Sequence, residues 1–234
     1  MLAVAGASSA CYRSAVTEPP RTRPERLARL SGLYAIVGDR DPVSRAAAAV
    51  DGGASVVQVR MKGAPAAEIL EVSRRIVALA RGRALVLVND RPDIALLAGA
   101  DGVHLGDEDL PPAEARALLG EQSLVGRTSR TVEEGRAALA AGADHLGFGP
   151  VFPSATKPLP VTPRGLPALA EACAALPAPV VAISGITLEN VAEVARAGAA
   201  AAAVIGDLFE RGDVRARAEA LVRAFASGRA ARGR

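Results

Sequence analysis

Four near-copies of one short Gly- and Ala-rich segment recur along the chain and constrain its fold more than any other feature. They occupy residues 52–55, 98–101, 141–144 and 197–200. Glycine at such a place is typical of a helix end, because it adopts the left-handed conformation that passes the chain to the next segment. A short apolar run follows each copy, so we predict repeated units of strand and helix.

The apolar runs are typical of strands in a buried parallel sheet, because most are continuously apolar rather than alternating. Aromatic residues are only 3% of the chain, so Val, Leu, Ile and Ala must form the core. Eight strands are predicted, at residues 32–37, 55–60, 84–89, 102–105, 123–128, 145–149, 179–184 and 202–206. A helical stretch is predicted after each strand, for example at residues 65–80, 112–119, 132–141, 166–176, 188–197 and 214–226. Eight units over roughly 200 residues predict an α/β fold, a single (β/α)₈ TIM barrel, whereas a doubly wound open sheet would rarely be so evenly spaced.

The two ends of the chain differ in composition from the part between them. Residues 1–28 are rich in Arg, Pro, Ser and Thr and are predicted to form a disordered extension. Residues 228–234 are predicted to form a short disordered tail, which leaves one TIM-barrel domain over residues 29–227. The net charge of +3 arises mainly from arginines near the two ends, without interleaved aromatics, so nucleic-acid binding is not expected.

Cysteine content and hydropathy indicate the compartment. Cys11 and Cys173 form neither a disulfide framework nor a metal motif, which predicts a reducing, cytoplasmic location. No charge-free apolar run reaches the roughly 18 residues of a membrane span. The first residues lack the basic region of a signal peptide. A homo-oligomer is compatible with the sequence.

Polar side chains gather where the predicted strands end, which is the end of a TIM barrel that carries its chemistry. They are Gln58, Arg60, Lys62, Asn89, Asp90, Asp109, Thr128, Ser154, Thr156 and Lys157. The turns that precede the strands consist mostly of Gly and Ala. Cations, carboxylates and hydroxyls on one rim indicate a site for an anionic ligand.

Asp90 and Asp109 are candidate metal ligands, because they follow neighbouring predicted strands. Mg²⁺ is usually bound by one or two carboxylates together with the phosphates of a substrate. The alternative is helix capping, since prolines follow both aspartates closely. Residues 184–187 and 205–206 are predicted to bind a phosphate, with ordinary turns as the alternative.

Only two of the 28 basic side chains are lysine, Lys62 and Lys157. A lysine retained in an arginine-rich chain suggests a place where a compact ammonium is needed, although two chance surface lysines are the alternative. His104, His145 and Cys173 are predicted to be structural.

These motifs, in this order, resemble those of thiamine phosphate synthases over about residues 32–222. The family's Gln-x-Arg-x-Lys stands at residues 58–62 and its Asn-Asp at residues 89–90. Its Gly-Val-His-Leu-Gly-x-x-Asp stands at residues 102–109, and its hydroxyl-x-Thr-Lys at residues 154–157.

The resemblance implies a transferase that joins a pyrimidine methyl diphosphate to a thiazole phosphate, or to its carboxylated form, and releases pyrophosphate. It implies Mg²⁺ as cofactor, bound by Asp90 and Asp109, and small phosphorylated molecules as partners. It implies catalytic roles for Arg60, Lys62, Thr128 and Lys157. The implied substrate-binding residues are Gln58, Val59, Arg60, Met61, Lys62, Asn89, Thr128, Ser154, Ala155, Thr156, Lys157, Gly185, Ile205 and Gly206.

The chain departs from the family pattern at three places. Thr128 and Arg130 replace a serine and a histidine after strand five, Ser184 replaces a glycine, and Gly206 replaces a serine. A thiazole tautomerase of the same fold is an alternative, but it uses the histidine that Arg130 replaces and generally lacks the carboxylate of Asp109. A non-catalytic barrel that binds a phosphate ligand for regulation is a second alternative.

Overall fold

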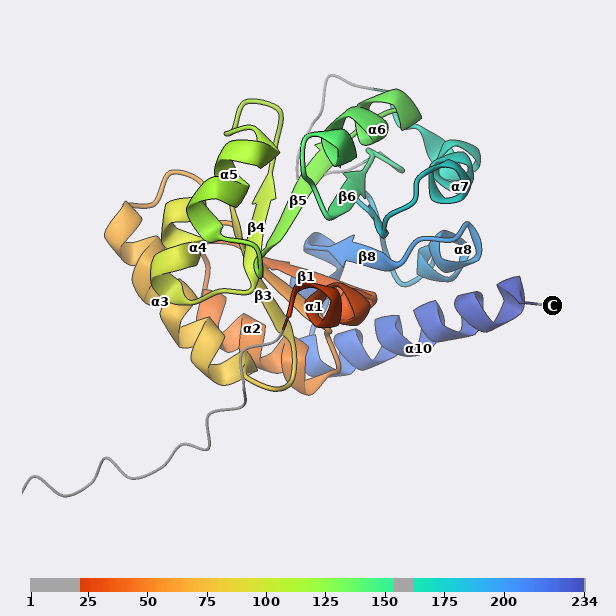
Figure 1. The fold of residues 1–234 in the computed structure, drawn as a ribbon. Helices are drawn as coiled ribbons and strands as arrows, with labels where there is room; N and C mark the ends of the chain where they lie inside the picture. The colour runs from red at the N-terminus through yellow and green to blue at the C-terminus, as the bar shows by residue number, and fades with distance from the viewer. Residues whose placement is uncertain (1–21, 154–161, 234) are drawn as a thin grey trace, which may run out of the picture.

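The computed structural model describes residues 22–153 and 162–233, and its strands form one closed parallel barrel. The strands are β1 (Gly32–Val37), β2 (Val56–Val59), β3 (Leu85–Asn89), β4 (Gly102–Leu105), β5 (Leu124–Ser129), β6 (His145–Phe148), β7 (Val180–Ala182) and β8 (Ala201–Val204). They pair in sequence order, and β8 closes the barrel on β1 (Figure 1). The predicted (β/α)₈ barrel is confirmed, and every strand lies within two residues of its predicted start and end.

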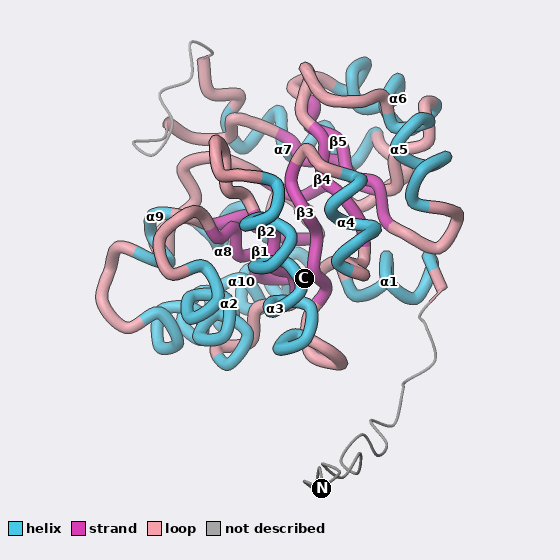
Figure 2. The backbone as a smooth tube through the Cα atoms, turned by 90° about the vertical axis from the view of Figure 1, so that its left-hand side faces the viewer, coloured by secondary structure: helices cyan, strands magenta, loops and turns pink. Residues whose placement is uncertain are grey.

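A ring of helices surrounds the strands (Figure 2). The helices of the ring are α2 (Pro42–Asp51), α3 (Ala66–Ala80), α4 (Pro92–Ala98), α5 (Pro112–Leu119), α6 (Val132–Ala140), α7 (Gly165–Ala175), α8 (Val191–Arg196), α9 (Gly206–Phe209) and α10 (Val214–Arg232). Their apolar faces pack on the outer faces of the strands in one continuous core of Val, Ile, Leu and Ala. A second cluster fills the inside of the barrel. Both faces of each strand are therefore buried, which explains the continuous apolar runs. No described helix combines the length and the apolar character that crossing a membrane would need.

The helix α1 (Arg23–Arg29) closes the amino-terminal end of the barrel (Figure 1). Thr22 and Glu25 form a capping box at its start. Arg29 donates to the carbonyls of Gly82 and Arg83 at 3.1 and 2.9 Å, in the turn before β3. The prediction of disorder is therefore wrong for residues 22–28, because contacts with distant turns stabilise this Arg-rich segment. The rest of the predicted extension, residues 1–21, lies outside the described residues.

The helix α10 contradicts the prediction of a disordered tail that begins at residue 228. It continues to Arg232 and packs along α8, with Gly228 buried in the contact. A Cβ atom at Gly228 would lie 2.1 Å from the carbonyl oxygen of Ala192. Gly228 is therefore what allows the two helices to approach. Arg234 lies outside the described residues.

We expect Gly228→Ala to lower the free energy of unfolding by roughly 1–3 kcal/mol, because the added methyl group would force α10 away from α8. In a frayed helix the same change would stabilise by up to about 1 kcal/mol. Urea unfolding decides the sign. The exposed neighbour Ser227 is the control, since Ser227→Ala should be neutral or slightly stabilising. A more stable Gly228→Ala variant would restore the prediction of a loose tail.

Candidate active site

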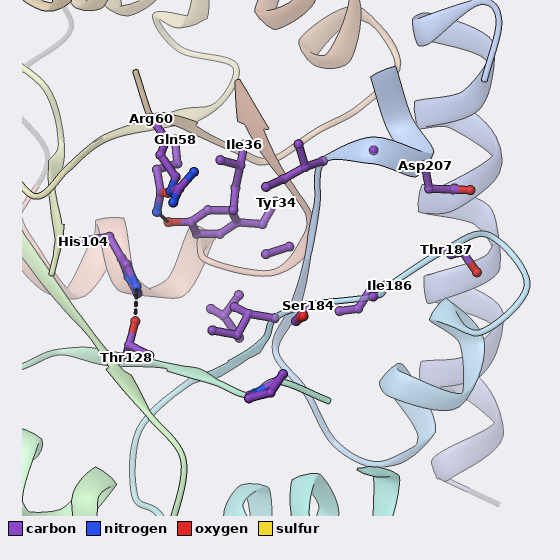
Figure 3. A pocket seen from close by; sticks show the side chains of 18 of the residues that line it. Tyr34, Ile36, Gln58, Arg60, His104, Thr128, Ser184, Ile186, Thr187 and Asp207 are labelled. Atoms are coloured by element: carbon purple, nitrogen blue, oxygen red, sulfur yellow. Dashed lines mark hydrogen bonds between the residues drawn. The ribbon is translucent and has the colours of Figure 1, made fainter. Parts of the chain in front are cut away.

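A cavity of about 470 Å³ opens at the carboxyl ends of the strands, where sequence analysis placed the site (Figure 3). Parallel strands that close into a barrel bring all their carboxyl ends together. Seven predicted site residues line it: Gln58, Arg60, Asn89, Thr128, Gly185, Ile205 and Gly206. Residues from five strands or the loops that follow them therefore converge on one ligand-sized space.

The inner wall of the cavity contains a buried polar pair that the sequence did not reveal. Gln58 donates from Nε2 to the hydroxyl oxygen of Tyr34 at 2.8 Å (Figure 3). Burial raises the pKa of Tyr34 above its usual range, so the phenol stays neutral. The bond fixes the orientation of the Gln58 carboxamide. The sequence indicated only that Tyr34 lies on a strand with its side chain inward. Sequence alone cannot distinguish such a position from an ordinary core position.

The two candidate metal ligands, Asp90 and Asp109, contact each other next to the cavity-lining Asn89, but neither they nor Lys62 line the cavity. Lys62 Nζ is 3.2 Å from Asp90 Oδ2, and Asp109 accepts from the backbone N–H of Gly106 at 2.6 Å. Burial first, and then the hydrogen bond with Asp90, raises the pKa of Asp109. Two carboxyl groups in contact repel when both are ionised, and a bound cation relieves the repulsion.

The helix-capping alternative for these aspartates is wrong. The N-cap residue of α4 is Arg91 and that of α5 is Pro111, and neither helix start has a side-chain cap. Asp90 has a left-handed backbone with φ of 64°. This conformation is uncommon for a residue other than glycine and is often associated with functional sites.

The donor set indicates which cation fits. Within residues 22–153 and 162–233, no group of three or more His, Cys, Asp or Glu side chains is arranged to hold a metal ion. A four-coordinate zinc site made by protein ligands alone is therefore not supported there. Two carboxylates beside a cavity lined by Arg60 and Asn89 suit Mg²⁺, which keeps several waters and takes oxygens from a ligand.

His104 and His145 form a buried pair inside the barrel, below the cavity. Their ring centroids are 6.0 Å apart, and His104 Nε2 lies 3.1 Å from Thr128 Oγ1. Burial lowers the pKa of His104 to about 4. Burial and the neighbouring ring lower the pKa of His145 to about 3. Both rings are therefore neutral near pH 7, and His104 lines the cavity, a position that sequence reasoning missed.

We expect the free energy of unfolding to fall as the pH is lowered from 7 to 5.5. Both histidines have lower pKa values in the folded state than the usual 6.5, so the unfolded chain binds more protons below pH 6.5. Each buried histidine then costs up to about 1.4 kcal/mol per pH unit. Urea unfolding at several pH values checks this slope, and His145→Gln should reduce it. A flat profile in this window would contradict the lowered pKa values.

The far side of the cavity consists of backbone from the loops after β7 and β8. Gly185 has φ of 67°, and a Cβ atom there would lie 2.3 Å from the carbonyl oxygen of Pro153. Only glycine fits this close approach. Asp207, which the sequence did not single out, is buried, accepts from Leu188 N–H at 3.1 Å and pairs with Arg217 at 2.6 Å. This contact ties the two loops together.

Some predicted residues lie elsewhere. Val59 and Met61 are buried in the core outside the barrel, and neither lines the cavity. They were predicted only because they lie between Gln58, Arg60 and Lys62 in the motif. Their side chains point away from the cavity. Ser154, Ala155, Thr156 and Lys157 lie outside the described residues.

Comparisons with known proteins agree on one family. Residues 33–208 match the family described as thiamine monophosphate synthase. The chain is 67% identical over 208 residues to a thiamine-phosphate synthase of Anaeromyxobacter dehalogenans (strain 2CP-C), covering 89% of this chain and 94% of the relative. It is 54% identical to one from Myxococcus xanthus (strain DK1622), covering 80% and 86%.

A solved structure gives the same answer. A thiamine phosphate pyrophosphorylase from Pyrococcus furiosus superposes with a TM-score of 0.78 at 34% identity. The match covers 86% of this chain and 98% of that one. Sequence and fold therefore point in the same direction over nearly the whole barrel.

Proposed function

Because the chain belongs to the thiamine monophosphate synthase family, we propose that it acts as a thiamine-phosphate synthase through the cavity at the carboxyl end of its barrel. The reaction is a transfer. The hydroxymethylpyrimidine of a diphosphate ester is joined to the ring nitrogen of a thiazole phosphate, which yields thiamine phosphate and pyrophosphate. From a carboxylated thiazole, CO₂ is also released.

The observation that carries the proposal is the convergence of cations and paired carboxylates on one rim. When the C–O bond breaks, both bonding electrons leave with the diphosphate, and the pyrimidine methylene is left as a cation. The lone pair of the thiazole nitrogen then forms the C–N bond. Negative charge grows on the leaving group, so positively charged and N–H donors aimed at it lower the barrier.

Arg60, Lys62 and Asn89 are the described residues that would hold the diphosphate. Arg60 and Asn89 line the cavity, and Lys62 stands at the rim within 3.2 Å of Asp90. Mg²⁺ bound by Asp90 and Asp109 would neutralise charge on the diphosphate. Lys157 stays a prediction from the resemblance, as do Ser154, Ala155 and Thr156. Of these, Ser154 and Thr156 would bind the thiazole phosphate together with the backbone of Gly185, Ile205 and Gly206.

The rest of the cavity suits a reactive cation. Tyr34 is held neutral by burial, and an apolar wall of Ile36, Val181 and Ile183 faces the same space. Apolar walls exclude water, which would otherwise capture the pyrimidine methylene before the thiazole nitrogen does. The orientation of Gln58 by Tyr34 offers a fixed hydrogen-bonding group for the pyrimidine ring.

Arg130 argues against the tautomerase alternative. It lines the cavity and forms an ion pair with Asp107, so the general base that a tautomerase needs is replaced by a cation that cannot accept a proton. The presence of Asp109 beside Asp90 favours a metal-dependent diphosphate reaction. The regulatory alternative does not require this set of charged groups.

One assay tests the function. Purified protein is incubated with the pyrimidine diphosphate, the thiazole phosphate and Mg²⁺, and thiamine phosphate and pyrophosphate are measured by chromatography. We expect equal amounts of both products. If neither substrate is consumed but the thiazole phosphate binds, a regulatory barrel would be favoured.

The free thiol of Cys173 suits the cytoplasmic location that we propose for this activity.

A further inference from the structure

The contact between His104 and Thr128 assigns a role to a histidine that the reaction as described above does not use. Figure 3 shows the imidazole of His104, from β4, directed at the hydroxyl of Thr128, from β5. The distance from Nε2 to Oγ1 is 3.1 Å. A hydroxyl has one proton and two lone pairs. The protonation of His104 Nε2 therefore decides whether the proton of the Thr128 hydroxyl remains available to a ligand. This inference rests on the proposed function, since it concerns how Thr128 meets the diphosphate.

The surroundings of the other ring nitrogen decide the tautomer. His104 Nδ1 is buried and has no hydrogen-bond partner among the described residues. It faces the bare Cα of Gly126, where an added Cβ would lie 2.8 Å from Nδ1. A Cα–H group is a weak donor and no acceptor. An N–H at Nδ1 would therefore be an orphaned buried donor, which native structures rarely tolerate, whereas a lone pair there is less costly.

The same reasoning applies to the protonated ring, because an imidazolium would also place an N–H at the unpartnered Nδ1. An imidazole carries a proton on at least one of its nitrogens, so the environment of Nδ1 places that proton on Nε2. The Nε2–H group lies 3.1 Å from Thr128 Oγ1 and donates to it.

We propose that His104 is a positioning residue that, as the neutral Nε2–H tautomer, donates to Thr128 Oγ1 and leaves the Thr128 hydroxyl proton free for an oxygen of the bound diphosphate. The Thr128 hydroxyl cannot donate its proton to His104, because the protonated Nε2 has no free lone pair to accept it. A donor held toward an oxygen that gains charge in the transition state lowers the barrier more than it strengthens ground-state binding. The β-branch of Thr128 further restricts its side-chain rotamer.

Imidazole ¹⁵N NMR of the wild-type protein tests the tautomer without any variant. The chain has only two histidines, so a protein made with a histidine-free purification tag gives two rings, which His145→Gln assigns. We expect a protonated Nε2 and an unprotonated Nδ1 for His104. A protonated Nδ1 would overturn the proposal.

A double-mutant cycle tests the role. His104→Leu should lower kcat about tenfold, the value of one hydrogen bond to a charged system, with little change in KM for the thiazole phosphate. In a Thr128→Val background the same change should cost nothing more, because the hydroxyl to be positioned is absent. Losses that simply multiply would overturn the proposal, because they would show that His104 acts independently of Thr128.

The neighbouring imidazole provides the matched control. His145 is fully buried and has no hydrogen bond to Thr128, so His145→Leu should keep kcat within about twofold. An equal loss of kcat in both leucine variants would show a general packing effect. His104→Gln retains an N–H donor and should recover most of the rate. Wild-type protein without synthase activity would refute the proposed function, whereas active protein with multiplying losses would refute only this inference.

Discussion

Replacing either Asp90 or Asp109 with asparagine is expected to lower turnover by at least about 10³-fold while leaving the fold intact. Asparagine keeps the size of the side chain and removes one charge from a site built on two contacting carboxyl groups. Loss of a metal that neutralises a leaving diphosphate removes several kcal/mol of transition-state stabilisation. Steady-state kinetics at increasing Mg²⁺ checks the prediction, with thermal unfolding measured on the same samples.

The stability of these variants separates a metal site from a structural one. Removing one of two repelling carboxylates should leave the melting temperature without Mg²⁺ unchanged or higher. Mg²⁺ should raise the melting temperature of the wild type and not of either variant, because a ligand stabilises only the state that binds it. Asp93→Asn is the control, since Asp93 pairs with Arg91 and does not line the cavity. Full activity in EDTA would refute the metal site.

Replacing Arg60 with alanine is expected to lower kcat by about 10²–10³-fold, the usual effect of removing one preorganised donor from a developing anion. Arg60 lines the cavity and is close enough to His104 to lower the pKa of that ring by its charge. Arg60→Lys should recover the rate only in part, because an ammonium cannot form the paired hydrogen bonds of a guanidinium.

The control for Arg60 is another arginine of the same rim. Arg91 follows β3, pairs with Asp93 and does not line the cavity, so Arg91→Ala should stay near wild-type activity. If Arg60→Lys were as active as the wild type, a point charge alone would be sufficient at this position. The resemblance predicts an equally steep loss for Lys157→Ala, with partial recovery in Lys157→Arg.

The barrel was predictable because its signals are local and repeated. A strand buried on both faces must be continuously apolar, as β3 and β8 are, and a helix that ends tightly needs glycine, as α4 does at Gly99. The two errors, α1 and the end of α10, concern segments that distant contacts stabilise. Arg29 binds a turn more than fifty residues away, and Gly228 is favourable only because α8 lies against it. Arg-rich composition gave no sign of either contact.

The site was predictable to the extent that it depends on strand ends. Gln58, Asn89 and Thr128 were brought into one cavity simply because parallel strands close. The metal and capping interpretations of Asp90 were equivalent in sequence, because an aspartate shortly before a proline suits both, and the backbone of α4 decides between them. The hydrogen-bond partners of Tyr34 and His104 depend on which residues of neighbouring strands point into the barrel at the same level. That register could not be predicted from the sequence.

The glycines on β5 and β6 have a consequence for which substitutions this chain can accept. A Cβ atom at Gly126 would lie 2.3 Å from His145 Nε2, and one at Gly147 would lie 2.9 Å from His104 Cε1. The two imidazoles therefore occupy the volume that these glycines leave empty. Substitutions at the four positions are coupled: a larger residue at 126 or 147 is acceptable only after 104 or 145 has become smaller. The inside of the barrel is here one shared volume, so single exchanges at Gly126 or Gly147 would clash with an imidazole even where the chemistry of the cavity would permit them.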